Sequence, residues 1–428
     1  MADDSINYPS RFSVNLTRTD CEALDRVDPL GYARERFSVP ENMVYLDGNS
    51  LGALPVATIA RLNDSIQREW GRGLIRSWNS ADWVTLPQRV GAAIAGLLGA
   101  SPDEVVAGDS TSVNIFKLLA GALTQASKQD PARRVILSER GNFPTDLYIA
   151  QGIIESLGSG HELRLVDGDI EAAFDECTAV ALITQVDYCT GRSHNMGRLN
   201  AAAKRVGTRI LWDLSHSAGA IPVDLNRDGA ELAVGCGYKY LNGGPGAPAY
   251  LYVQRAMQAD CPTPLSGWFG HAAPFDFSAD FAPAPGIDRF QCGTPSVLAM
   301  TALACGLDTF AGIDMLELRR KSLAQSDLFW TLMDKLCGEF GFACVSPRDH
   351  AMRGSQLSFA HEHAYPIMQA IIERGVIGDF RQPNLLRFGF TPLYLRYVDL
   401  WDAVAMIRDV MQSGDWKSDR YRHRNKVT

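Results

Sequence analysis

The sequence predicts an α/β fold with a mostly parallel, seven-stranded sheet between helices and a smaller α+β domain after it. Three observations support this prediction. From residue 104, short apolar runs alternate with helical stretches, which is typical of βαβ units. A glycine-rich segment, residues 235–246, interrupts the pattern between two strand candidates. After Pro264 the alternation ends. The strand candidates are 104–107, 134–137, 163–166, 179–184, 208–212, 230–234 and 248–253.

The predicted helices fall into the same two regions, one up to the end of the sheet and one beyond it. Apolar residues recur at helical spacing in several segments. Those before and within the sheet region are 20–26, 54–70, 86–98, 112–123, 145–157 and 199–206. Those beyond it are the helices 297–310, 313–336, 365–374 and 400–412, with strand candidates at 356–359 and 385–389. We therefore predict an N-terminal arm (1–44) that belongs to the small domain, a large domain (45–310), a C-terminal small domain (311–415) and a basic, mobile tail (416–428).

Composition limits the class of protein. The chain has 428 residues, of which 46% are hydrophobic and 21% charged, an ordinary globular mixture. The net charge of −8 argues against binding nucleic acid over the whole surface. No apolar run is long enough to span a membrane, and the acidic, polar start lacks the features of a signal peptide. Nine cysteines without a CxxC pair predict reduced thiols in a cytoplasmic enzyme, with neither disulfides nor a metal site.

The strongest local signal is the glycine-rich segment 235–246, GCGYKYLNGGPG, with Lys239 between two tyrosines. It follows a strand candidate, where the backbone can approach a ligand closely. A lysine among aromatic neighbours is a candidate for covalent chemistry with a carbonyl group. The alternative is a glycine-rich turn with no ligand and a solvated lysine.

A second signal is an acidic residue where the strand candidate 208–212 ends. Asp213 follows that strand directly, and His216 comes three residues later. In an α/β sheet this position faces the usual ligand crevice, where a carboxylate can hold a cationic group. The alternatives are that Asp213 caps the next turn and that His216 is a hydrogen-bonded, half-buried side chain.

A third signal is a run of small hydroxyl residues between a strand and a helix. Thr111 and Ser112 stand at the predicted start of the helix 112–123. Free N–H groups at a helix N-terminus attract anions such as phosphate, although a simple N-cap is the alternative. The chain has neither a P-loop nor a GxGxxG motif. Lysine, carboxylate and helix N-terminus together provide what pyridoxal phosphate requires for its aldehyde, its ring nitrogen and its phosphate.

Several motifs in order resemble the kynureninase family. Besides Asp213-Leu-Ser-His216 and GYKYLNGGPG, the resemblance covers LDGNSLG (46–52), TSVN (111–114), FPTD (143–146), GWFGH (267–271) and LRFGFTP (386–392). It extends from about Tyr45 to the last helix. It implies a fold-type I pyridoxal 5′-phosphate enzyme that hydrolyses L-kynurenine to anthranilate and L-alanine in tryptophan catabolism.

The resemblance also implies roles for individual residues. Lys239 would carry the cofactor and move the proton of the substrate's Cα, Tyr238 would assist proton transfer to the β-carbon, and Asp213 would hold the ring nitrogen. Phe143 would cover the face of the ring, and Thr111 and Ser112 would bind the phosphate. The further cofactor contacts that it implies are Asp146, Thr184 and His216.

Five more assignments follow from the same resemblance. Trp268 and Thr294 are similar to residues that reach the cofactor from a partner subunit, which implies a homodimer with shared active sites. Arg387 would bind the substrate α-carboxylate as a planar fork. Ser50 and Trp78 would form the rim of the substrate pocket. Family members that favour 3-hydroxykynurenine have a histidine-containing element where this chain has Arg-Ser-Trp-Asn (76–79), so we expect a preference for unsubstituted kynurenine.

Two alternatives remain at this point. A cysteine desulfurase or a class V aminotransferase would share the strand–aspartate and lysine-loop pattern. A desulfurase also needs a nucleophilic cysteine on a mobile loop, for which Cys337 and Cys344 are candidates. A non-catalytic protein with this fold is the other alternative, and the presence of Lys239, Asp213 and Arg387 argues against it.

Overall fold

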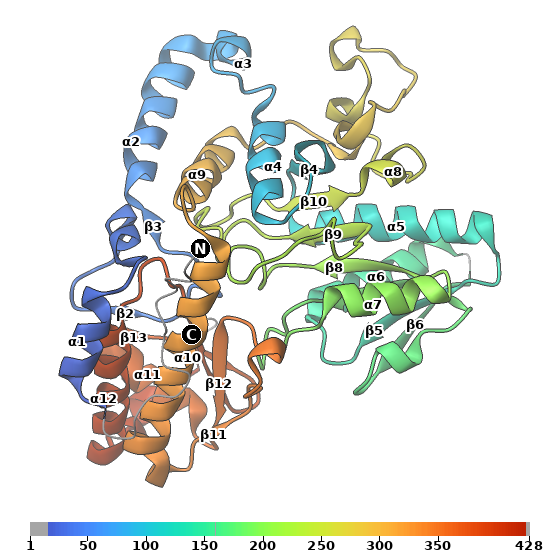
Figure 1. Ribbon diagram of the computed structural model, residues 1–428. Helices are drawn as coiled ribbons and strands as arrows, with labels where there is room; N and C mark the ends of the chain where they lie inside the picture. Colours follow the sequence, from blue (N-terminus) through green and yellow to red (C-terminus); the bar gives the residue numbers. More distant parts are fainter. Residues whose placement is uncertain (1–15, 159, 425–428) are drawn as a thin grey trace, which may run out of the picture. The chain divides into compact units, whose positions relative to one another are not determined.

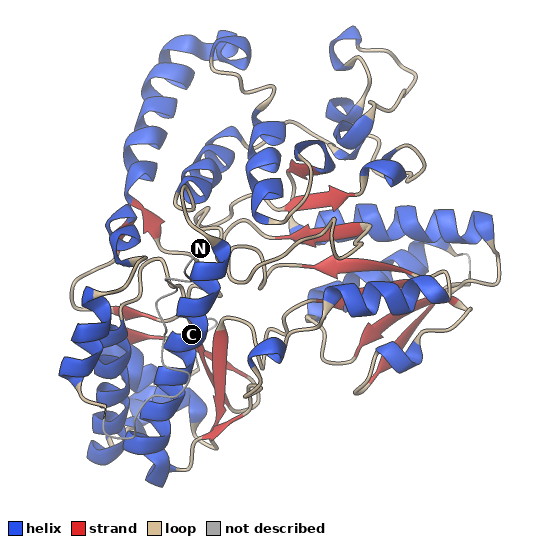
Figure 2. Ribbon diagram, viewed as in Figure 1, coloured by secondary structure: helices blue, strands red, loops and turns tan. Residues whose placement is uncertain are grey.

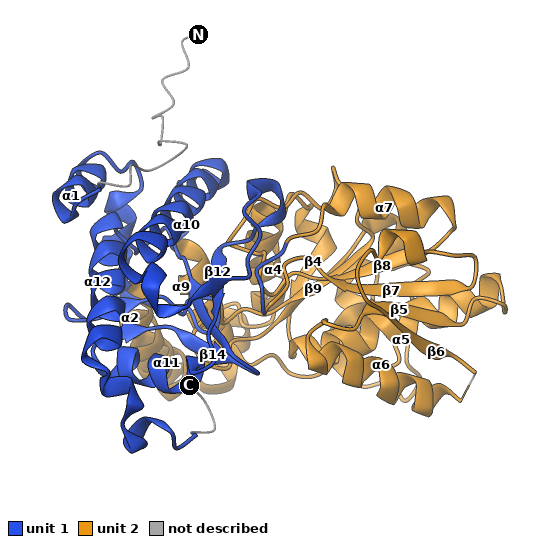
Figure 3. Ribbon diagram, turned by 90° about the horizontal axis from the view of Figure 1, so that it is seen from below, with its two compact units in different colours: residues 1–56, 189–192, 309–428 blue, residues 57–188, 193–308 orange. Residues whose placement is uncertain are grey.

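The computed structural model describes residues 16–158 and 160–424, which form two compact units (Figure 3). Of the described residues, 16–56, 189–192 and 309–424 belong to the first unit, and 57–158, 160–188 and 193–308 belong to the second. The expectations for the extreme ends of the chain, residues 1–15 and 425–428, lie outside the described residues.

The second unit is built on a sheet whose strand order is β4-β10-β9-β8-β7-β5-β6. Neighbouring strands pair in parallel except at β10, which runs opposite to both β4 and β9. The seven-stranded, mostly parallel sheet predicted from the sequence is therefore confirmed. Its strands are β4 (Val105–Ala107), β5 (Val135–Glu139), β6 (Glu162–Val166), β7 (Thr178–Thr184), β8 (Arg209–Asp213), β9 (Leu232–Gly235) and β10 (Tyr250–Val253).

Helices cover both faces of this sheet. Figures 1 and 3 show α7 on one face and α5 and α6 on the other. The buried apolar side of α5 contacts β7, β8, β9 and β10, and all seven residues of β7 are buried, as expected for a central strand. The helices of this unit are α2 (Val56–Asp64), α3 (Ser77–Ser80), α4 (Leu86–Leu97), α5 (Thr111–Gln129), α6 (Pro144–Leu157), α7 (Met196–Arg205), α8 (Arg255–Gln258) and α9 (Val297–Asp308).

Two local signals explain where the long helices of this unit begin and end. Ser110 has an extended backbone, and its hydroxyl accepts a hydrogen bond from the N–H of Val113, so it caps α5. In α6, Pro144 occupies the first turn and Gly158 ends the helix with a φ of 58°. The segment expected as one helix at 54–70 is instead α2 followed by a π-helical stretch (Ser65–Gly73) and a short 3₁₀ turn (Leu74–Arg76).

The first unit is an α+β arrangement, as Figure 2 shows by its clustered helices and short strands. Its antiparallel sheet has the order β11-β12-β15-β14, and α10 packs against α12, which also contacts α1. The helices are α1 (Arg18–Arg26), α10 (Met315–Cys337), α11 (Ala364–Glu373) and α12 (Tyr397–Ser413). The strands are β1 (Phe37–Ser38), β2 (Val44–Tyr45), β3 (Leu54–Pro55), β11 (Ala343–Cys344), β12 (Gln356–Ala360), β13 (Val376–Ile377), β14 (Asp379–Arg381) and β15 (Leu385–Gly389).

The division of the chain differs from the predicted boundaries at residues 45–56, 189–192 and 309–310. Residues 45–56 belong to the first unit, although the sequence-based boundary put them in the large domain. The reason is strand pairing, because β2 pairs in parallel with β13 and Asp47 bridges to Gly389. The motif LDGNSLG (46–52) therefore belongs to the smaller unit.

The described part of the C-terminal tail is folded, in contrast to the expected mobile segment. Two short 3₁₀ helices, Asp415–Lys417 and Asp419–Tyr421, contact α11 and bury Trp416 and Tyr421. The hydroxyl of Tyr365 donates a hydrogen bond of 3.0 Å to the carbonyl of His423. The many basic residues of this segment predicted mobility, but the buried side chains of Trp416 and Tyr421 anchor it. Within residues 16–158 and 160–424, no helix is long and apolar enough to cross a membrane.

Candidate active site

A pocket in the second unit opens where the strands of the sheet end. It encloses about 690 Å³ of space, within the usual range for small-molecule sites. Its residues follow the carboxyl ends of β4, β5, β7, β8 and β9, the edge at which open α/β sheets bind ligands. The residues that line it are Ser110, Thr111, Ser112, Phe143, Thr145, Asp146, Thr184, Tyr188, Asp213, Ser215, His216, Tyr238 and Lys239.

Lys239 enters this pocket from the glycine-rich segment after β9. Its Nζ lies 2.9 Å from Nε2 of His216 and 5.8 Å from the ring centres of Phe143 and Tyr238. The turn that presents it needs glycine at position 237, where a Cβ would stand 2.3 Å from the carbonyl oxygen of Pro248. The glycines thus allow the backbone packing that places one primary amine among aromatic rings.

Two buried carboxyl groups lie on the pocket wall. Burial raises the pKa of Asp213, although a 2.8 Å hydrogen bond from the N–H of Ser215 and the charge of Lys239 oppose that shift. Asp146 is 1% exposed, and its Oδ2 has no hydrogen-bond partner. Burial and the nearby charge of Asp213 raise its pKa well above the ordinary value. The pocket therefore favours a ligand that brings positive charge or N–H donors to these carboxyl groups.

The start of α5 attracts the opposite charge, because it offers groups that bind an anion. Thr111 and Ser112 are the first two residues of this helix, whose N-cap is Ser110. The N–H groups of a first helical turn have no intrahelical acceptor, and the helix dipole adds positive potential there. The pocket accordingly combines an anion-binding end with a cation-binding wall.

An aromatic pair and a polar network complete the pocket. The rings of Phe143 and Tyr188 meet edge to face, with centroids 5.2 Å apart and an interplanar angle of 89°. The hydroxyl of Thr184 donates to Oδ1 of Asn142, whose amide donates a 3.1 Å hydrogen bond to Ser138 Oγ. These contacts hold the end of β7 against the start of α6.

The other predicted residues of this unit lie outside that pocket. Trp78 stacks with Trp83 at 5.8 Å, edge to face, and with Phe269 at 6.1 Å. Phe269 also packs edge to face against Trp268, which is 39% exposed. Thr294 lines a separate cavity beside α5. The structure thus gathers nine of the predicted cofactor residues in one pocket, whereas Trp268 and Thr294 line other parts of this unit.

In the first unit, Arg387 and Ser50 belong to a charged cluster. Arg387 forms a bidentate ion pair with Asp379, in which Nε donates to Oδ1 at 2.8 Å, and Nη2 donates to the other carboxylate oxygen. Nη2 of Arg387 also donates to the hydroxyl of Ser50 at 2.9 Å. Arg381 lies 2.7 Å from the same carboxylate of Asp379. The cluster brings the two predicted substrate residues of this unit together.

Comparison with known proteins identifies the family. Residues 318–407 match the model of the kynureninase C-terminal domain. A kynureninase of Burkholderia mallei is 53% identical over 96% of this chain and all of its own length. A kynureninase of Pseudomonas fluorescens is 49% identical over the same shares. The chain belongs to the kynureninase family.

Solved structures confirm the fold. A cysteine desulfurase from Thermococcus onnurineus has a TM-score of 0.74 and 18% identity, covering 89% of this chain and 98% of its own. A variant of C-DES with glycine covalently linked to its pyridoxal phosphate cofactor has a TM-score of 0.75 and 18% identity, covering 88% and 99%. The expected fold-type I architecture is therefore confirmed, as are the expected family, enzyme class and cofactor.

The kynureninase cofactor, pyridoxal 5′-phosphate, fits the groups in the pocket. Its phosphate requires N–H donors, its aldehyde requires an amine and its ring nitrogen requires a carboxylate. The first turn of α5, Lys239 and Asp213 provide these groups, and the buried Oδ2 of Asp146 offers a further acceptor. Within the described parts of the chain, no cluster of three or more His, Cys, Asp or Glu residues could hold a metal ion.

Several residues of the pocket and of the charged cluster carry no clear signal in the sequence. Ser110, Thr145, Tyr188 and Ser215 line the pocket but were not predicted. Three of them adjoin predicted residues, so a rule that includes chain neighbours would have found them. Tyr188 stands four residues beyond the end of β7 and carries no such signal. Asp379, the partner of Arg387, was missed because β14 is only three residues long and lacks an apolar pattern.

Proposed function

We propose that this chain hydrolyses the Cβ–Cγ bond of L-kynurenine, releasing anthranilate and L-alanine, with Lys239, Tyr238 and Asp213 as its catalytic residues. The observation that supports these roles is the pocket itself. It combines Lys239 Nζ at 2.9 Å from His216 with the buried carboxyl of Asp213 and the start of α5.

Pyridoxal 5′-phosphate, when bound, supplies an electron-accepting ring that makes the Cα proton of the substrate acidic and its Cβ–Cγ bond labile. The amine of Lys239 takes up that proton and returns it. His216 accepts from or donates to this amine at 2.9 Å and so orients it. Water adds to the γ-carbonyl of the substrate and supplies the second carboxylate oxygen of anthranilate. The hydroxyl of Tyr238 delivers a proton to the β-carbon as the Cβ–Cγ bond breaks, a role supported by its place beside Lys239.

The remaining pocket residues bind and orient the cofactor. Thr111 and Ser112 hold the phosphate with the N-terminus of α5. Phe143 covers one face of the ring, and Asp213 keeps the ring nitrogen protonated by offering a buried carboxylate. The further contacts, which lie on the same pocket wall or at its strand ends, are Asp146, Thr184 and His216.

Substrate recognition rests on a second group of residues. Arg387 binds the α-carboxylate, and Asp379 holds the guanidinium in place for that contact. Ser50, which bonds to the same guanidinium, forms part of the rim. Trp78 offers an apolar, aromatic surface, so unsubstituted kynurenine is preferred over 3-hydroxykynurenine, whose hydroxyl would lose hydrogen bonds to water there.

We further propose a cytoplasmic homodimer with shared active sites. The segment 59–75 exposes large apolar side chains, among them Ile59 (56% exposed), Trp70 (57%) and Ile75 (77%). A patch of this kind on a helical segment is typical of a protein–protein interface. Trp268 and Thr294, which lie outside their own chain's cofactor pocket, would reach the pocket of the partner. The cysteines that the structure describes are all free, which is compatible with the proposed reducing compartment.

The competing desulfurase chemistry is not favoured by the cysteines. Burial raises the pKa of Cys337 to about 12 and that of Cys344 to about 11. Both thiols are therefore protonated near neutral pH and are poor nucleophiles. The likeness to desulfurases, at 18% identity, concerns the fold alone.

The experiment that tests this proposal is an anthranilate-fluorescence assay of the purified holoenzyme with kynurenine and 3-hydroxykynurenine side by side. We expect anthranilate and alanine in equal amounts, and a higher kcat/KM for kynurenine. Release of sulfur from cysteine without anthranilate formation would refute the proposed reaction. A higher kcat/KM for 3-hydroxykynurenine would refute the role of Trp78 alone. Gel filtration of Trp70→Glu, expected to elute as a monomer, tests the proposed interface.

A further inference from the structure

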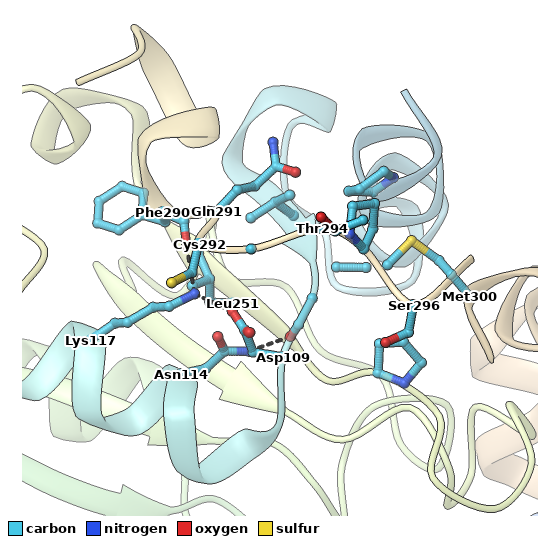
Figure 4. Close-up of a pocket in the computed structure, with 17 residues that line it drawn as sticks. Asp109, Asn114, Lys117, Leu251, Phe290, Gln291, Cys292, Thr294, Ser296 and Met300 are labelled. Carbon is cyan, nitrogen blue, oxygen red and sulfur yellow. Dashed lines mark hydrogen bonds and ion pairs between the residues drawn. The ribbon is translucent and has the colours of Figure 1, made fainter. Parts of the chain in front are cut away.

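Helix α5 carries a buried lysine that the proposed mechanism does not use. Lys117 is 1% exposed and stands six residues after Thr111. Its ammonium group forms an ion pair with Asp109 and donates a 2.7 Å hydrogen bond to the carbonyl of Phe290. Figure 4 shows this side chain pointing from α5 toward both partners, beside a cavity of about 490 Å³. Lysine is among the residues least often fully buried, so its partners indicate what it holds.

The first partner, Asp109, lies in the turn that leads into the anion-binding end of the pocket. Asp109 has a φ of 52°, a left-handed conformation that non-glycine residues adopt rarely. It directly precedes Ser110, the N-cap of α5, and its carbonyl accepts a 3.0 Å hydrogen bond from the N–H of Ala249. The ion pair with Lys117 therefore stabilises the turn that sets the direction of the N–H groups and hydroxyls of Thr111 and Ser112.

The second partner lies in the segment that carries Thr294. Phe290 is fully buried at the end of the 3₁₀ helix Gly286–Phe290, four residues before Thr294. Thr294 lines the same cavity as Lys117 and Asp109. The segment is held elsewhere by a 2.9 Å hydrogen bond from Gln88 Nε2 to Asp288. The ammonium of Lys117 thus fixes the backbone from which the chain continues to Thr294.

We propose that Lys117 is a positioning residue for cofactor binding, because one ammonium group fixes both the 109–112 turn and the 290–294 segment. This inference rests on the proposed function, which assigns Thr111 and Ser112 to the phosphate of their own site and Thr294 to the site of the partner subunit. Lys117 then connects the two cofactor sites of one dimer. A purely structural lysine would affect folding without affecting cofactor affinity.

The test is a titration of cofactor-stripped protein with pyridoxal 5′-phosphate, followed by absorbance, for the dimeric Lys117→Met variant. Methionine fills most of the space of the lysine side chain without its charge, and Asp109, at 30% side-chain exposure, can be hydrated after the loss of its partner. We expect the Kd for the cofactor to rise about tenfold, as for the loss of one charge-assisted hydrogen bond. At saturating cofactor we expect kcat to remain within about threefold of the wild type. The matched control is Lys128→Met, at an exposed position of the same helix, which should leave Kd unchanged.

A second pair of variants tests the connection to Thr294. If Lys117 acts partly through that residue, Lys117→Met should raise Kd less in a Thr294→Ala background than in the wild type. Asp109→Asn, which tolerates the left-handed backbone, is the alternative variant should Lys117→Met fail to fold. It should also raise Kd.

Failure of the role of Lys117 and failure of the proposed function give different results. An unchanged Kd in both Lys117→Met and Asp109→Asn would overturn the inference, as would strictly multiplicative effects of Lys117→Met and Thr294→Ala. If Ser112→Ala and Thr294→Ala raise Kd while Lys117→Met does not, the proposed function stands and Lys117 is structural. If Ser112→Ala and Thr294→Ala leave Kd unchanged, the assignment of these residues to the cofactor is wrong.

Discussion

Lys239 Nζ and His216 Nε2 lie 2.9 Å apart in the cofactor pocket. A protonated amine can only donate, so in that state the imidazole accepts through Nε2. His216 is 4% exposed, which fixes its ring and with it the direction of the amine. In the proposed function, this pair orients the one amine of the pocket for reaction with the aldehyde of the cofactor.

The first prediction concerns the amine itself. Lys239→Ala should lower kcat by at least about a thousandfold, because proton transfer at Cα loses its base and covalent attachment of the cofactor is lost. Borohydride treatment followed by mass spectrometry should show a stable cofactor adduct in the wild type and none in the variant. Lys204→Ala, at an exposed position, should behave as wild type. Full turnover by Lys239→Ala would exclude the mechanism.

Much of this site could be predicted because its signals are local. Asp213 ends an apolar strand, Lys239 stands in a glycine-rich turn, and Thr111 begins a helix. Each pattern is set by nearby residues, and parallel strands bring their carboxyl ends to one edge. The reversed direction of β10 could not be predicted, because an apolar run does not show which way a strand points.

The unpredicted parts depend on contacts that are distant in sequence. Residues 45–56 belong to the first unit because Val44 pairs with Val376, more than three hundred residues away. Asp379 belongs to no motif that the sequence shows, and its proposed role follows only from its ion pair with Arg387. Trp268 and Thr294 were assigned by resemblance alone, and their roles stay predictions.

The second prediction concerns the two buried carboxyl groups of the pocket. The pKa of Asp213 is raised by burial, and the pKa of Asp146 by burial and by the charge of Asp213. A carboxyl whose pKa is higher in the folded state binds protons more strongly there, so stability falls as the pH rises from its ordinary pKa to the raised one. The Tm of the cofactor-free protein should therefore fall across this range.

Asp213→Asn separates this stability effect from catalysis. The variant should weaken the pH dependence of Tm in the cofactor-free protein, since one of the two titrating groups is gone. It should also lower kcat about 100-fold or more, because an amide offsets a cationic ring nitrogen less well than a carboxylate does. An Asp213→Asn enzyme with wild-type kcat would show that this carboxylate does not act on the cofactor.

The third prediction concerns the partner of Arg387. Burial alone would raise the pKa of Asp379, but the charges of Arg387 and Arg381 and the hydrogen bonds of Arg387 and Ser50 outweigh it, so this pKa lies below its ordinary value. Asp379→Asn should raise KM for kynurenine about tenfold with a smaller change in kcat, because the guanidinium loses its charged anchor. Asp419→Asn, at a 92% exposed side chain of the same unit, should leave KM unchanged. An unchanged KM in Asp379→Asn would show that the ion pair does not position Arg387.

The last prediction is a pH dependence of substrate affinity that originates at Asp47. Burial and the charge of Asp379 raise the pKa of Asp47 to about 7, while Ser50, Arg387 and Arg381 act in the opposite direction. Oδ1 of Asp47 is buried without a hydrogen-bond partner. Below this pKa the group is neutral, and above it a negative charge is added near Arg387. A substrate carboxylate then meets additional repulsion, so its binding should weaken as the pH rises through 7.

The Ki of a competitive carboxylate inhibitor measures this effect without the chemical step. For the wild type, Ki should rise about threefold to tenfold between about pH 6 and pH 8, as expected for one partly screened charge. In Asp47→Asn the rise should vanish, because the amide does not titrate and remains in the neutral form throughout. Glu41→Gln removes an exposed acid of the same unit and should keep the wild-type profile, since screening by water leaves that charge little influence on Arg387. An equal pH dependence in wild type and Asp47→Asn would assign the titration to another group.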